Sequence, residues 1–216
     1  MAKKKVKRKV RRKPSPWNKG REVGQRAPLS LAEVTRIKKM LTKRGDGALR
    51  DLALFSTAID TMLRAQDLLA LTVKDVRKRD RVMRDPLELT TAKFGERVQC
   101  VLSKATKKTL ARWIDQCGKK PGGYLFTGRL GGGLTPMSVR QVSRLVKSWT
   151  EDIGLDASLY GMESLRRTRS IHILNKTENM EAVRIMLGLA DIRTTARYLS
   201  ASKPVNALAI NRAHQF

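Results

Sequence analysis

Apolar residues recur every three to four positions along most of this chain, which is the period of an amphipathic α-helix. The first such segment starts at Ser30, which forms a capping box with Glu33, a sequence signature of a helix start. Its apolar stripe runs through Leu31, Val34, Ile37 and Leu41. A second helix is predicted over about 47–63, and it runs directly into a helical stretch that lasts to about Leu71.

The pattern changes to β-type residues between Val73 and Leu102. Short strands are predicted in the stretches VKDVRKRDRV (73–82), LELTTAK (87–93) and RVQCVLS (97–103). Phe94-Gly95-Glu96 is the predicted turn between the last two, with Lys93 beside it. We therefore expect a small antiparallel sheet early in the chain.

Helical periodicity returns after the predicted sheet. One helix is predicted over 104–117, and another from Pro136 to Asp152, where Thr135 supplies the cap. The glycine-rich stretch between them, 122–135, is predicted to be a loop. Further helices are expected over 163–175, 178–187, 193–199 and 205–212. The fold class is therefore mainly α with a small antiparallel β-sheet, an α+β domain.

The charge balance indicates a polyanionic partner. Lysine and arginine total 46 of the 216 residues against 19 acidic residues, which gives a formal net charge of +27. No run approaches the roughly 18 apolar residues of a membrane-spanning helix, and no apolar stretch follows the basic N-terminus as it would in a signal peptide. The sequence favours nucleic acid over a membrane and predicts a cytoplasmic protein.

Residues 1–27 combine dense positive charge with almost no apolar periodicity, so burial cannot offset the entropy lost on ordering them. We expect an arm that is disordered when free and binds DNA phosphates with release of counterions. The alternative is a solubilising tail. The DNA-contacting candidates in this arm are Lys3, Lys4, Lys5, Lys7, Arg8, Lys9, Arg11, Arg12 and Lys13.

The cysteines and histidines give no sign of a metal site. The sequence holds two cysteines, Cys100 and Cys117, and two histidines, His172 and His214. They form no cluster at the ligand spacing of a zinc site, so neither a metal nor another cofactor is expected. Both cysteines are interpreted as reduced, and Cys117 shares its helical spacing with the apolar residues of the 104–117 helix, as a core thiol would.

The conspicuous polar residues are arginines at helix starts, a lysine at a turn and a tyrosine near the end of the chain. These are the parts needed for phosphoryl transfer without a metal. A tyrosine hydroxyl has a pKa of about 10, so it attacks a phosphodiester usefully only where cations stabilise the charge that builds on the phosphate. Arginine binds two phosphate oxygens at once, and a turn lysine can protonate the leaving sugar oxygen.

Three stretches resemble motifs of one family. MLRAQDLLALTVKDV resembles the box that holds the first arginine of the tyrosine recombinase (phage integrase) family, and TTAKFGERVQCVLS resembles its lysine-bearing β-hairpin. ESLRRTRSIHILNKTENMEAVRIMLGLADIRTTARYLS is similar to the second box, including Leu-Gly before a Thr-Thr-x-x-Tyr ending. The similarity runs from about residue 28 to 200 in family order, and the set is far more specific than any one box.

The resemblance implies a role for each matching residue. Arg64 and Arg166 clamp the scissile phosphate, and Tyr198 is the nucleophile. Lys93 protonates the 5′-oxygen leaving group, and Asp67 matches an acidic supporting position. Family members cut one strand at a time through a 3′-phosphotyrosyl bond and need no metal or nucleotide. The resemblance therefore implies a site-specific recombinase or integrase acting on double-stranded DNA.

Two positions depart from the family pattern. Glu163 stands where the family usually has histidine, three residues before the second arginine, and it can act as a general base or repel the phosphate. Leu189 stands where the family usually has histidine or tryptophan, and it cannot donate a hydrogen bond. Losing one such donor costs about 2–4 kcal/mol of transition-state stabilisation. We expect retuned, slower chemistry.

The resemblance also implies domains and partners. Larger family members carry a core-binding domain before the catalytic one, whereas this chain has only the basic arm before a catalytic domain over 28–202. The segment 203–216 is predicted to form a helix that either packs on its own domain or, as is common in the family, docks on a neighbouring protomer. Docking on a neighbour implies a homo-tetramer on two DNA sites. DNA-bending accessory proteins and association with the nucleoid of a bacterial or phage-bearing cell are further expectations.

Simpler interpretations stand beside each role. Arg64 alone reads as a helix-surface cation, and Tyr198 alone as a core aromatic residue. His172 is interpreted as a packing residue. Four other arginines are interpreted either as contacts to the DNA backbone phosphates or as solvent-exposed cations: Arg167, Arg169, Arg193 and Arg197. As whole-chain alternatives, the protein is a DNA-binding or accessory protein that kept the recombinase fold, or an RNA-binding ribosome-associated protein.

Overall fold

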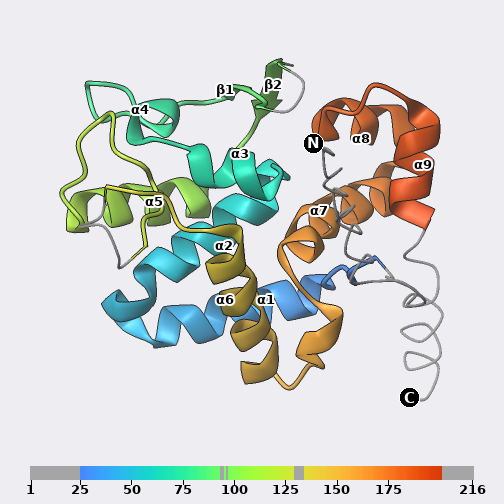
Figure 1. Cartoon of the computed structure of the whole chain (residues 1–216), viewed down its shortest axis with the longest axis horizontal. Coiled ribbons are helices and arrows are strands. Elements are labelled where there is room, and N and C mark those ends of the chain that lie inside the picture. Colours follow the sequence, from blue (N-terminus) through green and yellow to red (C-terminus); the bar gives the residue numbers. More distant parts are fainter. Residues whose placement is uncertain (1–24, 93–94, 96, 129–133, 201–216) are drawn as a thin grey trace, which may run out of the picture.

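The computed structural model describes residues 25–92, 95, 97–128 and 134–200 (Figure 1). Its elements are α1 (Leu31–Lys43), the 3-10 helix η1 (Gly45–Ala48), α2 (Leu49–Thr61), α3 (Ala65–Ala70), α4 (Val73–Val76), β1 (Leu87–Thr90), β2 (Arg97–Cys100), α5 (Lys104–Gln116), α6 (Val139–Asp152), the 3-10 helix η2 (Ala157–Leu159), α7 (Met162–Thr177), α8 (Met180–Leu187) and α9 (Ile192–Ser200). The predicted fold class is confirmed, since the described chain is mainly helical and carries a small antiparallel sheet.

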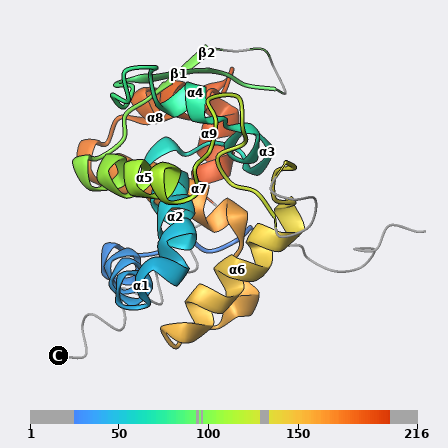
Figure 2. The same cartoon turned by 90° about the vertical axis from the view of Figure 1, so that its left-hand side faces the viewer.

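Helix α2 lies at the centre of the core because nearly every side chain along it is buried. It packs against α1, α5 and α7, and the side view of Figure 2 shows α5 crossing close to it. Phe55 of α2 is fully buried and meets Trp149 of α6 edge-on, with 5.6 Å between the ring centroids. The helices that carry the site therefore rest on one hydrophobic core.

The helix predicted to run through to Leu71 is interrupted, which corrects the expectation of a continuous segment. Helix α2 ends at Thr61, and Met62 adopts a left-handed conformation with φ 53°. This conformation is uncommon outside glycine, and neither glycine nor proline announces it in the sequence. The break places Arg64 at the N-cap position of α3.

The strand predicted over 73–82 is wrong. Val73–Val76 is the short helix α4, which a capping box between Thr72 and Asp75 opens. The backbone N–H and the hydroxyl of Thr72 both donate to the Asp75 carboxylate, at 2.8 and 2.6 Å. Beyond the helix, the segment keeps only an isolated bridge between Arg77 and Met83. This local hydrogen bonding outweighs the β-propensity of the two valines.

The other two predicted strands form the observed sheet. β1 and β2 pair antiparallel, with Leu87 opposite Cys100 and Leu89 opposite Val98. Leu87, Val98 and Cys100 are buried, so one face of the hairpin covers the core. The hairpin turn is described only at Gly95, whose N–H donates to the Thr91 carbonyl at 2.9 Å. The other turn residues, Lys93, Phe94 and Glu96, lie outside the described part of the chain.

Smaller corrections concern α6, the loop before it and Cys117. Helix α6 starts at Val139, three residues after the predicted start, because Ser138 rather than Thr135 caps it. The predicted loop contributes Leu125 and Phe126, both fully buried, to the core. Cys117 is half-buried rather than a core thiol, and among the described residues both cysteines are free. The helix predicted over 205–212 lies outside the described residues.

The last residues assigned to the basic arm are fixed against the domain. The Ala27 N–H donates to the Leu159 carbonyl at 3.0 Å, and the Leu29 N–H donates to the Thr168 hydroxyl of α7 at 3.0 Å. The His172 ring, also on α7, hydrogen-bonds the Leu29 carbonyl at 2.9 Å. Residues 25–27 therefore pack with the domain, although the sequence places them in the arm.

Asp60 joins three elements near the end of α2. Its carboxylate accepts a hydrogen bond from the Ser103 N–H, at the start of α5, at 2.8 Å. Arg169 of α7 lies 3.4 Å from the same carboxylate and also donates to the Asp60 carbonyl at 2.8 Å. Asp60 is 8% exposed, and loss of its carboxylate removes an acceptor that the Ser103 N–H and the Arg169 guanidinium share.

We predict that Asp60→Ala lowers the free energy of unfolding by about 2–3 kcal/mol, because it removes a nearly buried acceptor that the Ser103 N–H and the Arg169 guanidinium share. Urea denaturation monitored by circular dichroism measures the change. Asp46→Ala is the control, since the Asp46–Arg112 ion pair is largely exposed and such pairs contribute about 0–1 kcal/mol. Equal losses in the two variants would contradict a structural role for Asp60.

Candidate functional site

Two adjacent arginines in the first turns of α7 form the base of the site. Arg166 is 5% exposed and Arg167 is fully buried, which is unusual because charged side chains rarely enter the core without partners. An Arg166 Nη2 donates to the Leu187 carbonyl at the end of α8, at 2.7 Å. Arg167 donates through Nη1 to the side-chain oxygen of Gln25. Helix α7 therefore projects two guanidinium groups into a space bounded by α8 and the N-terminal segment.

The turn between α8 and α9 brings α9 back towards α7. Gly188 ends α8 with φ 59°, the left-handed conformation that glycine adopts without strain. Arg184 stabilises this turn, because its Nη1 donates to the Leu189 carbonyl at 2.5 Å while its Nη2 pairs with Glu181 at 2.6 Å. Figure 1 shows α7, α8 and α9 gathered at one end of the molecule, and the three helices contact one another.

Tyr198 of α9 lies over the two arginines. The centre of its ring is 5.9 Å from the Arg166 guanidinium carbon and 5.3 Å from that of Arg167, which is cation–π distance. Its hydroxyl oxygen is buried and has no hydrogen-bond partner within the described residues. A buried hydroxyl without a hydrogen-bond partner, next to two cations, favours the binding of a polar or anionic ligand.

Burial sets the acidity of this cluster. It raises the pKa of Tyr198 far above the usual value of about 10, and the negative charge of Glu163 raises it further, while Arg166 and Arg167 act in the opposite direction. Glu163 itself is exposed, and its carboxylate lies near the Tyr198 hydroxyl. Tyr198 is therefore protonated at neutral pH, and the Glu163 carboxylate lies near its hydroxyl group.

Arg64 approaches the same cluster from the break between α2 and α3. Burial lowers the pKa of Arg166, Tyr198 opposes this shift, and the nearby positive charge of Arg64 lowers the pKa further. The guanidinium groups of Arg64 and Arg166 repel each other because both are positively charged. A phosphate bound between them would reduce this repulsion. The structure thus brings together Arg64, Arg166 and Tyr198, with Glu163 beside them.

Asp67 connects this cluster to the β-hairpin. Its carboxylate accepts a hydrogen bond from the Ala92 N–H at 2.9 Å, one residue before Lys93. The bond ties α3, which begins just after Arg64, to the strand end that leads into the hairpin turn. The position of the Lys93 side chain lies outside the described residues.

Leu189 packs rather than donates. Its side chain lies in a small apolar cluster with Met62, Val183, Leu187 and Leu199, and Tyr198 packs against the same cluster. An apolar side chain at this position adds to the cluster on which Tyr198 also packs, but it offers no hydrogen bond to a bound anion.

Among the predicted site residues, Arg167 is the one whose interpretation the structure changes most. The sequence presents it as a phosphate contact or a solvated cation, whereas the structure buries it beneath the Tyr198 ring. In a very basic chain, two adjacent arginines are expected to lie on the surface. The packing of α9 over α7 is what buries Arg167. The contact of Arg167 with Gln25 has no sequence signal either.

The arm candidates from Lys3 to Lys13 lie outside the described residues, as does the segment 203–216. Within the described ranges, no group of three or more histidine, cysteine, aspartate or glutamate side chains is placed to hold a metal ion. None of the described helices is long and apolar enough to cross a membrane.

Known proteins share this sequence pattern and fold. The family model described as the phage integrase family matches residues 28–204. Tyrosine recombinase XerC of Vibrio atlanticus is 27% identical over 187 residues, which cover 84% of this chain and 57% of the relative. The probable integrase/recombinase YoeC of Bacillus subtilis is 24% identical over 180 residues, which cover 83% of this chain and 92% of the relative. The chain thus spans little more than half the length of the XerC relative.

A solved structure agrees on the fold. The pre-cleavage complex of XerH site-specific recombinase bound to difH substrate superimposes with a TM-score of 0.66 at 17% identity. The match covers 81% of this chain and 50% of the XerH chain. At this identity the comparison establishes the shared fold of the described domain, and the resemblance seen in the three sequence motifs is confirmed by the family match.

We predict that Tyr198 keeps its proton to a pH well above 10 in the free protein, because burial and Glu163 disfavour the phenolate. Carbon-13 NMR of ring-labelled tyrosine, assigned with Tyr198→Phe, measures the titration. Glu163→Gln should lower the pKa of Tyr198, since it removes a neighbouring negative charge. A Tyr198 signal that titrates at or below 10, or that ignores Glu163→Gln, would contradict the arrangement.

Proposed function

Since this chain belongs to the phage integrase family, we propose that it is a site-specific recombinase that cleaves and rejoins double-stranded DNA through a 3′-phosphotyrosyl bond at Tyr198. The observation that carries the proposal is the placement of the Tyr198 ring against the guanidinium groups of Arg166 and Arg167, with its hydroxyl buried and unpartnered. A core aromatic residue without a chemical task would have its hydroxyl satisfied.

The proposed reaction follows from the groups present. Arg64 and Arg166 bind the non-bridging oxygens of the scissile phosphate and stabilise the charge that builds in the transition state. The Tyr198 oxygen attacks phosphorus, and its proton passes to the Glu163 carboxylate. The bond from phosphorus to the 5′-oxygen breaks, and Lys93 protonates that oxygen. One phosphodiester is exchanged for another, so religation is the same reaction in reverse and needs no cofactor.

Two further residues act by positioning. The guanidinium carbon of Arg167 lies 5.3 Å from the centre of the Tyr198 ring, so Arg167 holds the ring in place and adds positive charge to the site. Asp67 holds the strand end before Lys93 through the Ala92 N–H, so that the hairpin turn stays near the phosphate held by Arg64. These are proposals that the hydrogen bonds and distances support.

The proposed partner is double-stranded DNA. The net charge of +27 favours a polyanion, and the XerH relative in fold was solved bound to its difH substrate. We propose that the arm of residues 1–24 adds phosphate contacts, and that residues 203–216 dock on a neighbouring protomer in a tetramer on two sites. DNA-bending accessory proteins and association with the nucleoid complete the proposal.

A second candidate function is a DNA-binding or accessory protein with weakened chemistry. Leu189 favours it, because this side chain packs in an apolar cluster and donates no hydrogen bond to a phosphate. The raised pKa of Tyr198 also favours it, since the hydroxyl resists deprotonation until a base acts. Detection of a covalent intermediate separates the two functions, and preference for duplex DNA over RNA separates both from an RNA-binding protein.

We predict a covalent protein–DNA adduct with a duplex that carries a candidate target site and a nick just after the scissile phosphate, because the released fragment diffuses away. A denaturing gel detects the adduct, and Tyr198→Phe should abolish it while retaining affinity for the duplex. Tyr160→Phe is the control, since Tyr160 is a second buried tyrosine that packs in the main hydrophobic core, whereas Tyr198 packs against the smaller cluster. Tight duplex binding without any adduct would establish the accessory function instead.

The two departures from the family pattern should act in opposite ways on the rate of adduct formation. We predict that Glu163→Gln slows it by at least about tenfold, because a proton acceptor is lost. Leu189→His should accelerate it by about tenfold or more, because a hydrogen-bond donor is gained. Single-turnover kinetics at saturating protein separate these effects from affinity.

Glu151→Gln on α6 is the control for loss of one negative charge, since Glu151 is exposed and lies outside the cluster. Faster adduct formation in Glu163→Gln than in Glu151→Gln would show that the Glu163 carboxylate repels the phosphate and accepts no proton.

A further inference from the structure

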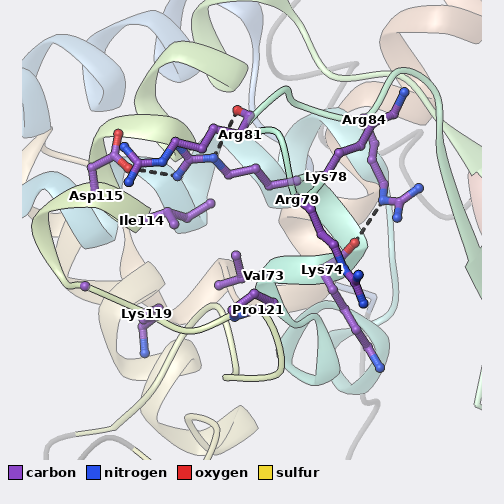
Figure 3. Close-up of a pocket in the computed structure, with 12 residues that line it drawn as sticks. Val73, Lys74, Lys78, Arg79, Arg81, Arg84, Ile114, Asp115, Lys119 and Pro121 are labelled. Atoms are coloured by element: carbon purple, nitrogen blue, oxygen red, sulfur yellow. Dashed lines mark hydrogen bonds and ion pairs between the residues drawn. The ribbon is translucent and has the colours of Figure 1, made fainter.

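A second concentration of positive charge lies far from Tyr198. A pocket of about 600 Å³ opens between α4, the segment that leads from α4 towards β1, and the end of α5 with the residues that follow it. Val73 and Ile114 contribute apolar side chains to its lining (Figure 3). We call it the cationic pocket, and its basic lining residues are Lys74, Arg77, Lys78, Arg79, Arg81, Arg84 and Lys119.

Local hydrogen bonds hold parts of this lining in place. Arg77 donates to Asp115 at 2.8 Å and to the Arg81 carbonyl at 3.0 Å, and Arg84 donates through Nε to the Lys74 carbonyl at 2.8 Å. Asp115 is the one acid among the described lining residues, and it is engaged by Arg77. The remaining cations therefore face the pocket with little compensation, which is an arrangement that favours a bound anion.

The cationic pocket is separate from the proposed catalytic site. Figure 1 shows α4 and α5 at one end of the long axis, whereas α8 and α9 lie at the other end, and Figure 2 shows α4 and α5 on the face turned towards the viewer. None of its lining residues belongs to the cluster around Tyr198. The charge at this pocket is therefore not part of the group of side chains proposed to bind the scissile phosphate.

We propose that the cationic pocket binds the phosphate backbone of a duplex DNA segment other than the one held at Tyr198. This inference rests on the proposed function only for the identity of the polyanion. Figure 3 shows Arg84 and Lys74 on one side of the pocket and Lys119 on the other, so the charges are spread rather than focused on one point. A spread row of cations fits a strand with one negative charge about every 3.4 Å, whereas a small anion requires convergent donors.

The test compares two variants that each remove two exposed lysines four residues apart. Lys74→Gln/Lys78→Gln alters the pocket, and Lys39→Gln/Lys43→Gln on α1 is the matched control. Binding is measured by fluorescence anisotropy with a duplex of about 12 base pairs, which matches the ~40 Å width of such a domain, and with one of about 45 base pairs. Adding a second equivalent of the short duplex tests whether a separate DNA molecule binds to the protein at the same time as the first.

We expect the pocket variant to lose about tenfold in affinity for the long duplex or for the second short duplex, and the slope of log affinity against log salt to fall by about two. The first short duplex should bind as before, and the α1 variant should change neither value. Equal losses in both variants would reduce the effect to net charge and overturn the proposal. Binding of tripolyphosphate at the pocket without loss of duplex affinity would also overturn it.

The outcome is independent of catalysis. If no Tyr198 adduct forms but the pocket variant still loses affinity for the second duplex segment, the proposed recombinase function fails and the second DNA site stands. If the adduct forms and the pocket variant binds both duplexes like the unaltered protein, the opposite holds.

Discussion

The burial of two neighbouring arginines on α7 is the constraint on which the rest of the site depends. Arg166 and Arg167 are almost without solvent, and burial lowers the pKa of both. Their charges are tolerated because each finds a fixed acceptor, the Leu187 carbonyl for Arg166 and the Gln25 side chain for Arg167. These acceptors come from α8 and from the N-terminal segment, so the same bonds that satisfy the charges also assemble the walls of the site.

Tyr198 is held by packing rather than by hydrogen bonds. The Gly188 turn and the contacts of Arg184 return the chain towards α7, and a small apolar cluster that includes Leu187 and Leu199 fixes α9 there. Apolar contacts locate the ring while leaving its hydroxyl unsatisfied. This division explains how a buried polar atom persists without a partner, since the cost of its desolvation is offset by the apolar surface that α9 buries.

The sequence predicts most of this fold because its helices are amphipathic and several start at recognisable caps. It fails over 73–82, where β-branched residues suggest a strand but the Thr72–Asp75 capping box opens a helix. It also fails at Met62, whose left-handed conformation has no local signal and whose side chain is buried in the apolar cluster with residues of α7, α8 and α9. Motif resemblance locates Arg64, Arg166 and Tyr198, but the burial of Arg167 depends on contacts between segments far apart in the chain.

The two unusual residues act on different properties of Tyr198. Glu163 contributes charge, which raises the pKa of the hydroxyl, and Leu189 contributes apolar surface to the cluster on which the ring packs. Both favour the neutral phenol in the absence of a ligand, since neither stabilises a phenolate. The positive field of Arg64, Arg166 and Arg167 opposes them, and it acts equally on an incoming phosphate. In the proposed mechanism, this balance means that the anion is attracted first and that the proton of Tyr198 then passes to Glu163.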